Sequence, residues 1–560
     1  PSVSPEPSVS PEPSVSPEPS GETDDSSIAT VNGCPCVADE VLVQFKKSAS
    51  DAEVQKTLDA VDAEAPEEIT DNLHVAGIPD GETITDYIDT LEDQPDVLYA
   101  QPNFLYTLND SNIVPAGSLT PSSETGLPND SYLGYEWHLG KISAYKAWDT
   151  TMGDSNVRVA VLDTGADLDH PDLVGHIVYQ EDIADDDGSA DDDNGHGTHV
   201  AGTIAATANN GIGVAGVAPG VSLMIFDVFH YDADEGDVVA ASSDLVDGIA
   251  AAVSHDANVI NMSLGGYRLD IAEQTAVDAA VSAGVVVIAA AGNDATTTAC
   301  YPSDLNSVIS VMATDRNDAL ASYSNYGPLK DISAPGGDSD DYRNWILSTY
   351  LDGGYAWAAG TSMAAPVVSG VVALMLSADP GLTVSQIKSK LYSSAVDLGV
   401  VDKDNYFGNG RVNAMSAVRS VKGITSSSYA IDRRNSCLTN IPVGTSLSDI
   451  QSALSSSFGT INFYNASGSS VTSGIAVTGM RAQLLDGGVV KDDLGIIVKG
   501  DANGDGVVNI SDYTHVKLRI LGKESPSTEY RLAGDVNGDG VVNISDYTDI
   551  RLAILGLRAL

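Results

Sequence analysis

Three nearly continuous apolar runs constrain the fold of this 560-residue chain more than any other feature. They are Asn156–Leu162, Val259–Leu264 and Val285–Ala291, and segments with helical spacing lie between them. A strand that is apolar along its whole length is covered on both faces, as in a parallel sheet with helices on both sides. Residues 129–422 are therefore predicted to form a doubly wound α/β domain, with functional side chains at the carboxyl ends of its strands.

The N-terminal part of the chain differs in composition from residues 129–422. A chain of 560 residues is also too long to fold around a single hydrophobic core, so more than one domain is expected. Residues 1–37 begin with a repeated Pro-Ser-Val-Ser-Pro-Glu and are predicted to be a linker. Residues 38–107 alternate in the order β-α-β-α-β, which predicts a small α+β domain of the ferredoxin type. The strands are expected at Glu40–Phe45, Leu73–Ile78 and Val97–Phe104, and the helices at Ala52–Val61 and Ile84–Leu91.

Two further segments follow the α/β domain. A Ser-rich hinge, Thr425–Ser428, leads into residues 429–498, where short alternating runs predict a small β-rich module; a mere spacer is the alternative. Residues 499–560 hold an internal repeat, because DANGDGVVNISDYT at Asp501 returns as DVNGDGVVNISDYT at Asp535. A single helix is expected after each copy, at Tyr513–Leu521 and Tyr547–Leu555.

The charge of the chain excludes two classes of partner. The formal net charge is −52, from 79 acidic and 27 basic residues, and a field of that sign repels nucleic acid and anionic lipid. The carboxylates serve solubility, calcium binding or both. The stretch Val281–Ala291 is too short to span a bilayer, so no transmembrane helix is expected. Since the sequence starts at Pro1 without Met or an apolar leader, we expect a processed or trimmed fragment.

Three polar side chains stand at the ends of predicted elements and suggest nucleophilic catalysis. Asp163 ends the first apolar run in Asp-Thr-Gly, His196 opens a helix in Gly-His-Gly-Thr-His, and Ser362 opens another in Gly-Thr-Ser-Met-Ala-Ala-Pro. A serine hydroxyl needs a base to take its proton, and a buried carboxylate holds that histidine in one tautomer. The sequence therefore predicts Ser362 as nucleophile, His196 as general base and acid, and Asp163 as the residue that orients it.

An oxyanion site is predicted beside the serine. Asn293 follows a strand end in Ala-Ala-Gly-Asn, where its amide can donate to the developing oxyanion together with the backbone N–H of Ser362. His199 is interpreted as structural, because the His-Glu-x-x-His pattern of a zinc protease is absent.

In this order the motifs DTG, HGTHVAG, AAAGN and GTSMAAP resemble those of the subtilisin family, from about residue 129 to residue 420. The resemblance implies a serine endopeptidase with the four catalytic residues named above. It also implies that Ser263, Leu264 and Gly265 form the edge that pairs with the substrate backbone, a mode that favours extended peptides. Cys300 takes the position that lines the family's primary specificity pocket. A cysteine engaged elsewhere is the alternative, and pairing of Cys300 with Cys437 stays open.

Residues 38–106 resemble the inhibitory propeptide of subtilases, which implies a folding aid whose last strand lies in the substrate cleft. Cleavage is expected between Tyr106 and Asn129, by Ser362 itself; a permanent interaction domain is the alternative. The stretch from Asn209 to Val214 resembles the family's calcium loop. By that resemblance the ligands are the side chains of Asp130, Asp172 and Asn210 and the carbonyls of Ile212 and Val214.

The C-terminal repeats predict two calcium loops with oxygen ligands at positions 1, 3, 5, 7, 9 and 12. Glycine stands at the sixth position of both loops, where the chain must turn sharply, and Asp replaces the usual Glu at the twelfth. The ligands of loop one are Asp501, Asn503, Asp505, the Val507 carbonyl, Asn509 and Asp512; those of loop two are Asp535, Asn537, Asp539, the Val541 carbonyl, Asn543 and Asp546.

Tandem loops of this kind, each followed by one helix, resemble dockerin domains, which bind cohesin modules on scaffold or cell-surface proteins. The resemblance implies Ile510, Ser511, Ile544 and Ser545 as recognition positions. A calcium clip that only stabilises the C-terminus is the alternative.

Together these features predict a secreted serine endopeptidase, made as a zymogen with calcium as its cofactor. A dockerin would tether it to a cohesin-bearing partner at a cell surface or in a cellulosome-like assembly. Two hypotheses of another class remain open: an inactive binding module, and a docking or scaffold protein whose catalysis is dispensable.

Overall fold

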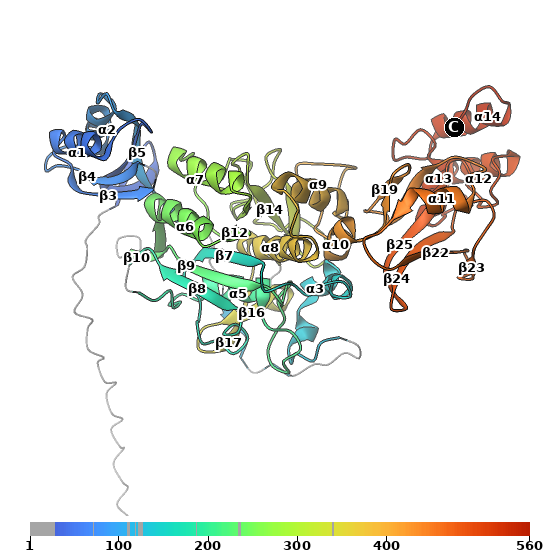
Figure 1. Ribbon diagram of the computed structural model, residues 1–560, viewed down its shortest axis with the longest axis horizontal. Coiled ribbons are helices and arrows are strands. Elements are labelled where there is room, and N and C mark those ends of the chain that lie inside the picture. The colour runs from blue at the N-terminus through green and yellow to red at the C-terminus, as the bar shows by residue number, and fades with distance from the viewer. Residues whose placement is uncertain are drawn as a thin grey trace, which may run out of the picture.

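The structure is a computed structural model that describes residues 28–70, 72–108, 113–117, 119–120, 127–185, 188–232, 237–338 and 341–560. Most of the predicted N-terminal linker, residues 1–27, lies outside this range. Figure 1 shows a small N-terminal lobe in blue, a central α/β body in green and yellow, and a C-terminal lobe in orange and red.

The central body is built on a seven-stranded sheet in the order β15-β14-β13-β12-β7-β9-β8, and every neighbouring pair is parallel. The three apolar runs of the sequence are neighbours in it, as β7, β12 and β13. The strands are β7 (Arg158–Asp163), β8 (Ile177–Asp182), β9 (Ser222–Asp227), β12 (Val259–Met262), β13 (Val286–Ala290), β14 (Ile309–Thr314) and β15 (Ile332–Pro335).

Helices cover both faces of this sheet, which confirms the doubly wound α/β fold. Val159 and Val161 pack into one hydrophobic core with α5 and α8, whereas Ala160 and Leu162 pack into a second core with α6 and α7. The helices of the central body are α3 (Trp137–Lys141), α4 (Ala144–Trp148), α5 (His196–Ala205), α6 (Ser242–Ser254), α7 (Ile271–Ser282), α8 (Thr361–Ala378), α9 (Val384–Ser394) and α10 (Ala414–Lys422).

Helix α8 is the one helix of the described residues with the length and apolar composition of a membrane span, but 94% of it is buried inside the protein. It lies against β12, β13, β14 and β15 as the central core helix (Figure 1). Two short 3-10 helices, η1 (Leu133–Tyr135) and η2 (Tyr342–Asn344), and a small sheet of β6 (Ile113–Pro115), β16 (Ile346–Tyr350) and β17 (Gly354–Ala358) complete the body.

The N-terminal lobe has the predicted ferredoxin-type fold with two strands more than the sequence indicated, β1 and β3. Strand β1 pairs with the start of β2, so residues 28–37 belong to the folded lobe and not to the predicted linker 1–37. Strand β3 joins α1 to β4 and completes the order β-α-β-β-α-β, with sheet order β5-β2-β4-β3. Its sequence, EAPEEIT, holds three glutamates and a proline, which suit an exposed edge strand but hide the strand pattern. The elements are β1 (Ile28–Val31), β2 (Cys34–Phe45), α1 (Asp51–Ala60), β3 (Glu64–Thr70), β4 (Leu73–Gly77), α2 (Ile84–Glu92) and β5 (Val97–Thr107).

The sheet of the N-terminal lobe continues into the central body. Strand β5 pairs with β2 on one side and, near its end, with β11 (Asp237–Ala241) on the other; β11 pairs in turn with β10 (His230–Asp232). The end of β5 therefore lies directly on the surface of the α/β body.

The C-terminal lobe contains the predicted β-rich module, followed by helical repeats. A six-stranded sheet in the order β19-β20-β25-β24-β22-β23 encloses its own hydrophobic core. The elements are β18 (Thr425–Ser426), β19 (Ala430–Asp432), β20 (Cys437–Ile441), α11 (Leu447–Ala453), β21 (Leu454–Ser455), β22 (Thr460–Tyr464), β23 (Ser470–Val471), β24 (Arg481–Asp486), β25 (Val489–Val498), α12 (Ile510–Ile520), α13 (Thr528–Gly534) and α14 (Ile544–Ile554).

The two repeat helices begin three residues earlier than predicted, at Ile510 and Ile544. Asn509 and Asn543 are their N-caps, and each forms a capping box with the aspartate three residues on. The sequence pattern marks these side chains as metal ligands, and their second role as helix caps explains why the helices begin earlier than predicted.

Candidate active site

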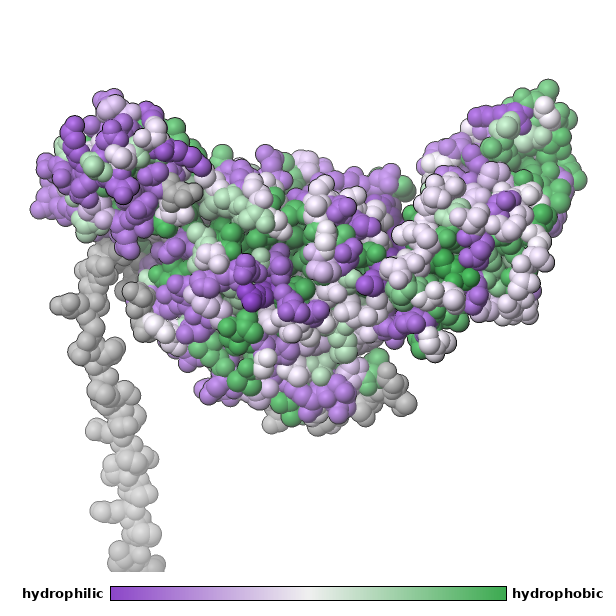
Figure 2. Space-filling view, viewed as in Figure 1, coloured by the Kyte–Doolittle hydropathy of each residue, from purple (hydrophilic) through white to green (hydrophobic). Residues whose placement is uncertain are grey.

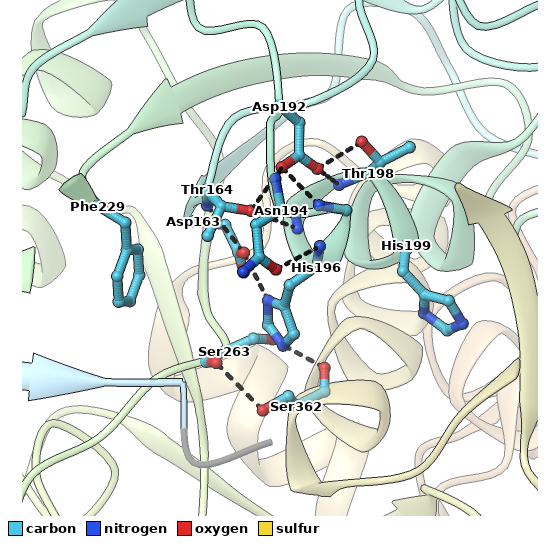
Figure 3. Close-up of polar contacts among 12 residues, drawn as sticks. Asp163, Thr164, Asp192, Asn194, His196, Thr198, His199, Phe229, Ser263 and Ser362 are labelled. Atoms are coloured by element: carbon cyan, nitrogen blue, oxygen red, sulfur yellow. Dashed lines mark hydrogen bonds and ion pairs between the residues drawn. The ribbon is translucent and has the colours of Figure 1, made fainter. Parts of the chain in front are cut away.

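Asp163 and His196 form a buried pair at the carboxyl end of the central sheet. Asp163 is the last residue of β7 and His196 the first of α5, and His196 Nδ1 lies 2.6 Å from Asp163 Oδ1. Both side chains are at most 1% exposed, and the same carboxylate oxygen accepts from Thr164 N at 2.9 Å. This contact fixes which ring nitrogen faces the carboxylate and orients the other towards the serines drawn in Figure 3.

Asp192 holds the segment that carries His196, and sequence reasoning missed it. Its Oδ1 accepts from Asn194 N at 2.9 Å and Gly195 N at 2.8 Å, and its Oδ2 accepts from Thr198 N at 2.8 Å (Figure 3). Burial raises the pKa of Asp192, and the N–H donors oppose that rise. Its run of three aspartates reads as a solvated loop in the sequence, and only its burial distinguishes it.

The residue after His196 must be a glycine, because the backbone of Gly197 lies very close to the backbone of Gly165. A Cβ on Gly197 would lie 2.1 Å from the carbonyl oxygen of Gly165, so no larger residue fits there without a shift of the backbone. The glycine-rich surroundings of His196 thus allow α5 to pack directly against the loop that follows β7.

Ser362 and Ser263 are joined by two hydrogen bonds. Ser362 Oγ donates to the carbonyl oxygen of Ser263 at 3.1 Å, and Ser263 Oγ donates to the carbonyl oxygen of Ser362 at 2.8 Å. Ser362 lies in the first turn of α8, so the positive end of that helix points towards any charge that develops beside it. Figure 3 shows the imidazole of His196 between Asp163 and this pair of serines.

Asn293 is fixed by its side-chain oxygen. Its Oδ1 accepts from Thr361 N at 2.9 Å and from Thr361 Oγ1 at 2.8 Å. Because the oxygen of the carboxamide is turned to Thr361, the NH₂ end is turned away from it. Thr361 directly precedes Ser362, so this contact sets the position of Asn293 relative to the serine.

The end of β5 lies in a groove with a strand edge on each side. Thr107 pairs with Val239 of β11 and, across the groove, with Gly265 in an antiparallel bridge. Leu264 is 2% exposed and packs in the same core as Tyr106. Gly265 therefore pairs with the chain's own N-terminal lobe, and pairing of the segment from Ser263 to Gly265 with a substrate stays a prediction.

Side chains of the N-terminal lobe cap two helices of the central body. Gln101 Oε1 accepts from Ile271 N at 3.1 Å, at the start of α7, and Asn103 Oδ1 accepts from Ser243 N at 3.0 Å, at the start of α6. Gln101 Nε2 also donates to Asp270 Oδ1 at 2.8 Å. These contacts satisfy N–H groups that a helix leaves without partners, and so they hold β5 in the groove.

Cys300 lies next to Gly292, the residue before Asn293, where an added Cβ would lie 3.2 Å from Cys300 Sγ. It is fully buried, its thiol is free, and burial raises its pKa to about 12. Cys437 is buried and also free, so these two cysteines are not paired.

Lys330, which sequence reasoning did not single out, contacts the segment that leads to Asn293. Its Nζ lies 2.8 Å from Asp304 Oδ1 and donates to Ala291 O and Ser303 Oγ, both at 3.1 Å. Both charged side chains are 2% exposed. A buried ion pair thus joins the strand end before Asn293 to the loop that follows Cys300.

The predicted calcium loop of the central body is brought together as a hydrogen-bonded cluster. Asp130 accepts from Asn209 N at 2.8 Å and from Asn210 N at 3.0 Å, while Asn210 Nδ2 donates to Asp172 Oδ1 at 2.6 Å. Val214 N donates to Asp172 Oδ2 at 3.2 Å, and Ile212 N donates to Asn210 Oδ1 at 3.0 Å. These oxygens face N–H donors, and calcium binding at this loop stays a prediction.

The C-terminal loops gather the hard oxygen donors that calcium prefers. In loop two, carboxylate oxygens of Asp535, Asp539 and Asp546 lie within 4.8 Å of one another. In loop one, Asp501 is fully buried and its Oδ1 has no hydrogen-bond partner among the described residues, an orphaned anionic oxygen that a cation would satisfy. The donor set of both loops therefore fits calcium.

The predicted recognition positions lie on the surface at the outer end of the molecule. Ile510 is 66% exposed and Ile544 is 67% exposed, each as the first residue of its helix, and Ser511 and Ser545 follow them. Tyr513 and Tyr547 stack with ring centroids 4.0 Å apart, so the two helices lie side by side. Figure 2 shows hydrophobic residues gathered over this end of the C-terminal lobe.

Comparison with known proteins gives matches along most of the chain. Residues 154–410 match the model of the subtilase family, residues 499–555 that of the dockerin type I domain, and residues 22–103 that of the fervidolysin N-terminal prodomain. Thermitase of Thermoactinomyces vulgaris is 39% identical over 293 residues, which are 52% of this chain and 99% of thermitase.

Two further relatives are similar to this chain, and the first of them matches a longer part of it than thermitase does. A thermophilic serine proteinase of Bacillus sp. (strain AK1) is 35% identical over 386 residues, 68% of this chain and 88% of that protein. Subtilisin E of Bacillus subtilis (strain 168) is 42% identical over 273 residues, 47% of this chain and 66% of that protein.

Proposed function

Because this chain belongs to the subtilase family of serine endopeptidases and carries a prodomain and a dockerin domain, we propose that it is a secreted zymogen whose catalytic residues are Asp163, His196, Ser362 and Asn293. The observation that carries the proposal is the buried contact of 2.6 Å between His196 Nδ1 and Asp163, with Ser362 on the far side of the imidazole.

The proposed reaction is hydrolysis of a peptide bond in two steps. Ser362 Oγ attacks the carbonyl carbon while His196 Nε2 takes the hydroxyl proton, and that proton then passes to the departing amine. A water molecule next attacks the acyl-enzyme, with His196 again as base, and the carboxylic acid leaves. Asp163 holds the imidazole in its tautomer and stabilises the imidazolium during both steps.

The negative charge on the carbonyl oxygen is proposed to be stabilised by two donors. One is the side-chain NH₂ of Asn293, which is supported by the fixation of its oxygen on Thr361. The other is the backbone N–H of Ser362 at the start of α8, where the helix dipole adds to the effect.

The prodomain is proposed to inhibit the enzyme by occupying its substrate groove. The pairing of Thr107 with both Val239 and Gly265 supports this role, because a strand held on both sides excludes a substrate from the same edges. Cleavage of the connection to the peptidase domain is proposed to lie between Tyr106 and Asn129. Part of that stretch, including residues 109–112, lies outside the described residues.

The dockerin domain is proposed to bind a cohesin module of a scaffold or cell-surface protein through Ile510, Ser511, Ile544 and Ser545. The exposure of both isoleucines at equivalent helix starts supports two similar faces for one partner. Calcium would be held by the oxygen ligands of the two loops and would so fix the starts of the two helices. The carboxylates of Asp535, Asp539 and Asp546, which lie close together, support such a site in loop two.

The enzymatic proposal is tested with unfolded casein, the full-length chain and a Ser362→Ala variant, all in the presence of calcium. Hydrolysis by the first protein and none by the second is expected. If neither hydrolyses casein, even after removal of residues 1–128, the docking or scaffold hypothesis replaces the enzyme.

The docking proposal needs a separate assay, which uses the inactive Ser362→Ala chain and a purified cohesin. Binding in calcium, its loss with a chelator, and its loss in an Asp501→Ala/Asp535→Ala variant are expected. Calcium binding that stabilises the chain without any cohesin binding would favour the structural clip instead.

A further inference from the structure

A tyrosine of the prodomain lies in a pocket whose floor is a carboxyl group. Tyr106 is 2% exposed, and it belongs to the hydrophobic cluster that also contains Ala240, Leu245 and Leu264. Its hydroxyl donates to Glu273 Oε2 at 2.9 Å, and Glu273 is itself fully buried. An apolar pocket that ends in a buried carboxyl is suited to one kind of side chain, an aromatic ring with a hydroxyl at its tip.

Glu273 is held in this position by its helix rather than by the tyrosine. It belongs to the first turn of α7, and its backbone N–H donates to the N-cap Asp270 at 2.9 Å. A glutamate at this point of a helix commonly reaches back to the cap. Here the carboxyl instead lies inside the protein, where Tyr106 supplies its hydrogen bond.

The register of the groove relates this pocket to the bond that is cut. Tyr106 directly precedes Thr107, which pairs with Gly265 in antiparallel fashion. A strand in this register brings the residue two places further on opposite Ser263, whose carbonyl oxygen is 3.1 Å from Ser362 Oγ. The pocket therefore receives the fourth residue before the cleaved bond, counting back from the one that supplies the reacting carbonyl.

We propose that Glu273 makes this peptidase selective for substrates with a tyrosine as the fourth residue before the cleaved bond. This inference rests on the proposed function, because it assigns a preference to the same groove. The pocket also limits the shape of the side chain, since a Cβ on Gly266 would lie 3.2 Å from Tyr106 Cδ1 and the ring therefore fills the space beside the backbone.

The discrimination comes from the cost of an unpartnered carboxyl. When the pocket is open, water can solvate Glu273; a phenylalanine or leucine would expel that water and return no hydrogen bond. Burial and the neighbouring Asp270 carboxylate raise the pKa of Glu273 well above its ordinary value, which favours the neutral acid. A neutral carboxyl can accept from a tyrosine hydroxyl or donate to it, so tyrosine satisfies the pocket in either case.

The test compares two extended peptides that differ only at this position, tyrosine in one and phenylalanine in the other. The full-length chain, after it has processed itself in calcium, is expected to have a kcat/KM about 10- to 100-fold higher for the tyrosine peptide. Equal values for the two peptides would overturn the proposal, and this comparison needs no variant.

Variants of Glu273 then test whether its carboxyl group causes the preference for tyrosine. Glu273→Leu should abolish or reverse the preference while it still cleaves the phenylalanine peptide, and Glu273→Gln should retain much of it because an amide still offers a hydrogen bond. Asp278→Asn, which removes an exposed carboxylate from the same helix, is the matched control and should leave the ratio unchanged. An undiminished preference in Glu273→Leu would overturn the assignment.

Hydrolysis of casein distinguishes a failure of the tyrosine preference from a failure of the proposed peptidase activity. Hydrolysis of casein without a tyrosine preference would overturn this inference and leave the proposed function intact. No hydrolysis of casein or of either peptide would overturn the proposed function itself.

Discussion

Thr107 and Gly265 exchange both of their backbone hydrogen bonds across the substrate groove, at 3.3 and 3.1 Å. The pairing is antiparallel, so each step forward from Thr107 corresponds to one step back from Gly265. Two such steps lead to Ser263, which is hydrogen-bonded to Ser362 in both directions. This pair therefore sets the register of β5 against the segment from Ser263 to Gly265.

The register predicts where the chain first cuts itself. Counting along the sequence, the position two residues after Thr107 is Asn109, so the first cleavage is expected between Asn109 and Asp110. Intact-mass analysis and N-terminal sequencing of the fragments would locate the cut, with an uncut Ser362→Ala chain as control. A first cut at any other bond between Tyr106 and Asn129 would show that the strand shifts before it reacts.

Replacement of Asn293 by alanine should lower kcat by about 10²–10³-fold with little change in KM, because an oxyanion donor acts in the transition state and not on the bound substrate. Steady-state kinetics on a peptide substrate measures both parameters. Asn156→Ala, an exposed asparagine in a turn, is the matched control. An equal loss in both variants, or a change confined to KM, would argue against the oxyanion role.

The buried Lys330–Asp304 pair should be essential for stability. Lys330→Met leaves Asp304 charged and unpaired in the interior, and we expect a loss of about 3–5 kcal/mol in the free energy of unfolding. Urea titrations in the Ser362→Ala background avoid self-digestion. The double variant Lys330→Met/Asp304→Leu should recover most of the loss.

A partly exposed ion pair, Lys403 with Asp331, provides the comparison for the buried pair of Lys330 and Asp304. Lys403 lies 3.2 Å from Asp331, and its side chain is 42% exposed. Lys403→Met should cost less than about 1 kcal/mol, because solvent screens such pairs. Similar losses for Lys330→Met and Lys403→Met would mean that burial of the first pair is energetically unimportant.

Two buried histidines predict that the peptidase domain loses stability in acid. Burial lowers the pKa of His138 and of His199 to about 3, and each histidine is further disfavoured by a neighbouring imidazole. In the unfolded chain these two imidazole rings bind protons below about pH 6.5. In the folded chain the same two rings stay neutral until about pH 3. The stabilising contribution is therefore complete above pH 6.5 and is lost progressively as the pH falls towards 3.

Urea midpoints of the Ser362→Ala chain between pH 7 and pH 4.5 would measure this loss, at about 2–3 kcal/mol for each histidine at the lower pH. A His138→Phe variant should lose less on acidification, and His255→Gln, at a half-exposed position, should behave like the parent. Parallel pH curves for the parent and His138→Phe would contradict the assignment.

Much of the fold and of the candidate site follows from local sequence signals. The apolar runs that form β7, β12 and β13 need only their own composition to be placed in a covered parallel sheet. Asp163, His196 and Ser362 stand at strand or helix ends within short motifs, and the topology then brings them to one edge of the sheet.

Other features depend on partners far away in the chain, and no local pattern marks them. Asp192 is buried, whereas its neighbours Asp191 and Asp193 are exposed, and nothing in the run of three aspartates marks that difference. Lys330 meets Asp304 through folding alone, and Glu273 reads as an ordinary helix-start glutamate until Tyr106 is placed against it.

The strand that fills the groove is also a structural strand of the prodomain, since β5 pairs with β11 on one edge and with β2 on the other. Cutting the chain beyond β5 therefore leaves that sheet intact. The strand can leave only when the prodomain separates as a unit or unfolds, and its core is one small hydrophobic cluster around Val41, Phe45 and Leu91. We therefore expect a lag between processing and activity, which should shorten when the folding stability of this small domain, Ile28–Thr107, is lowered.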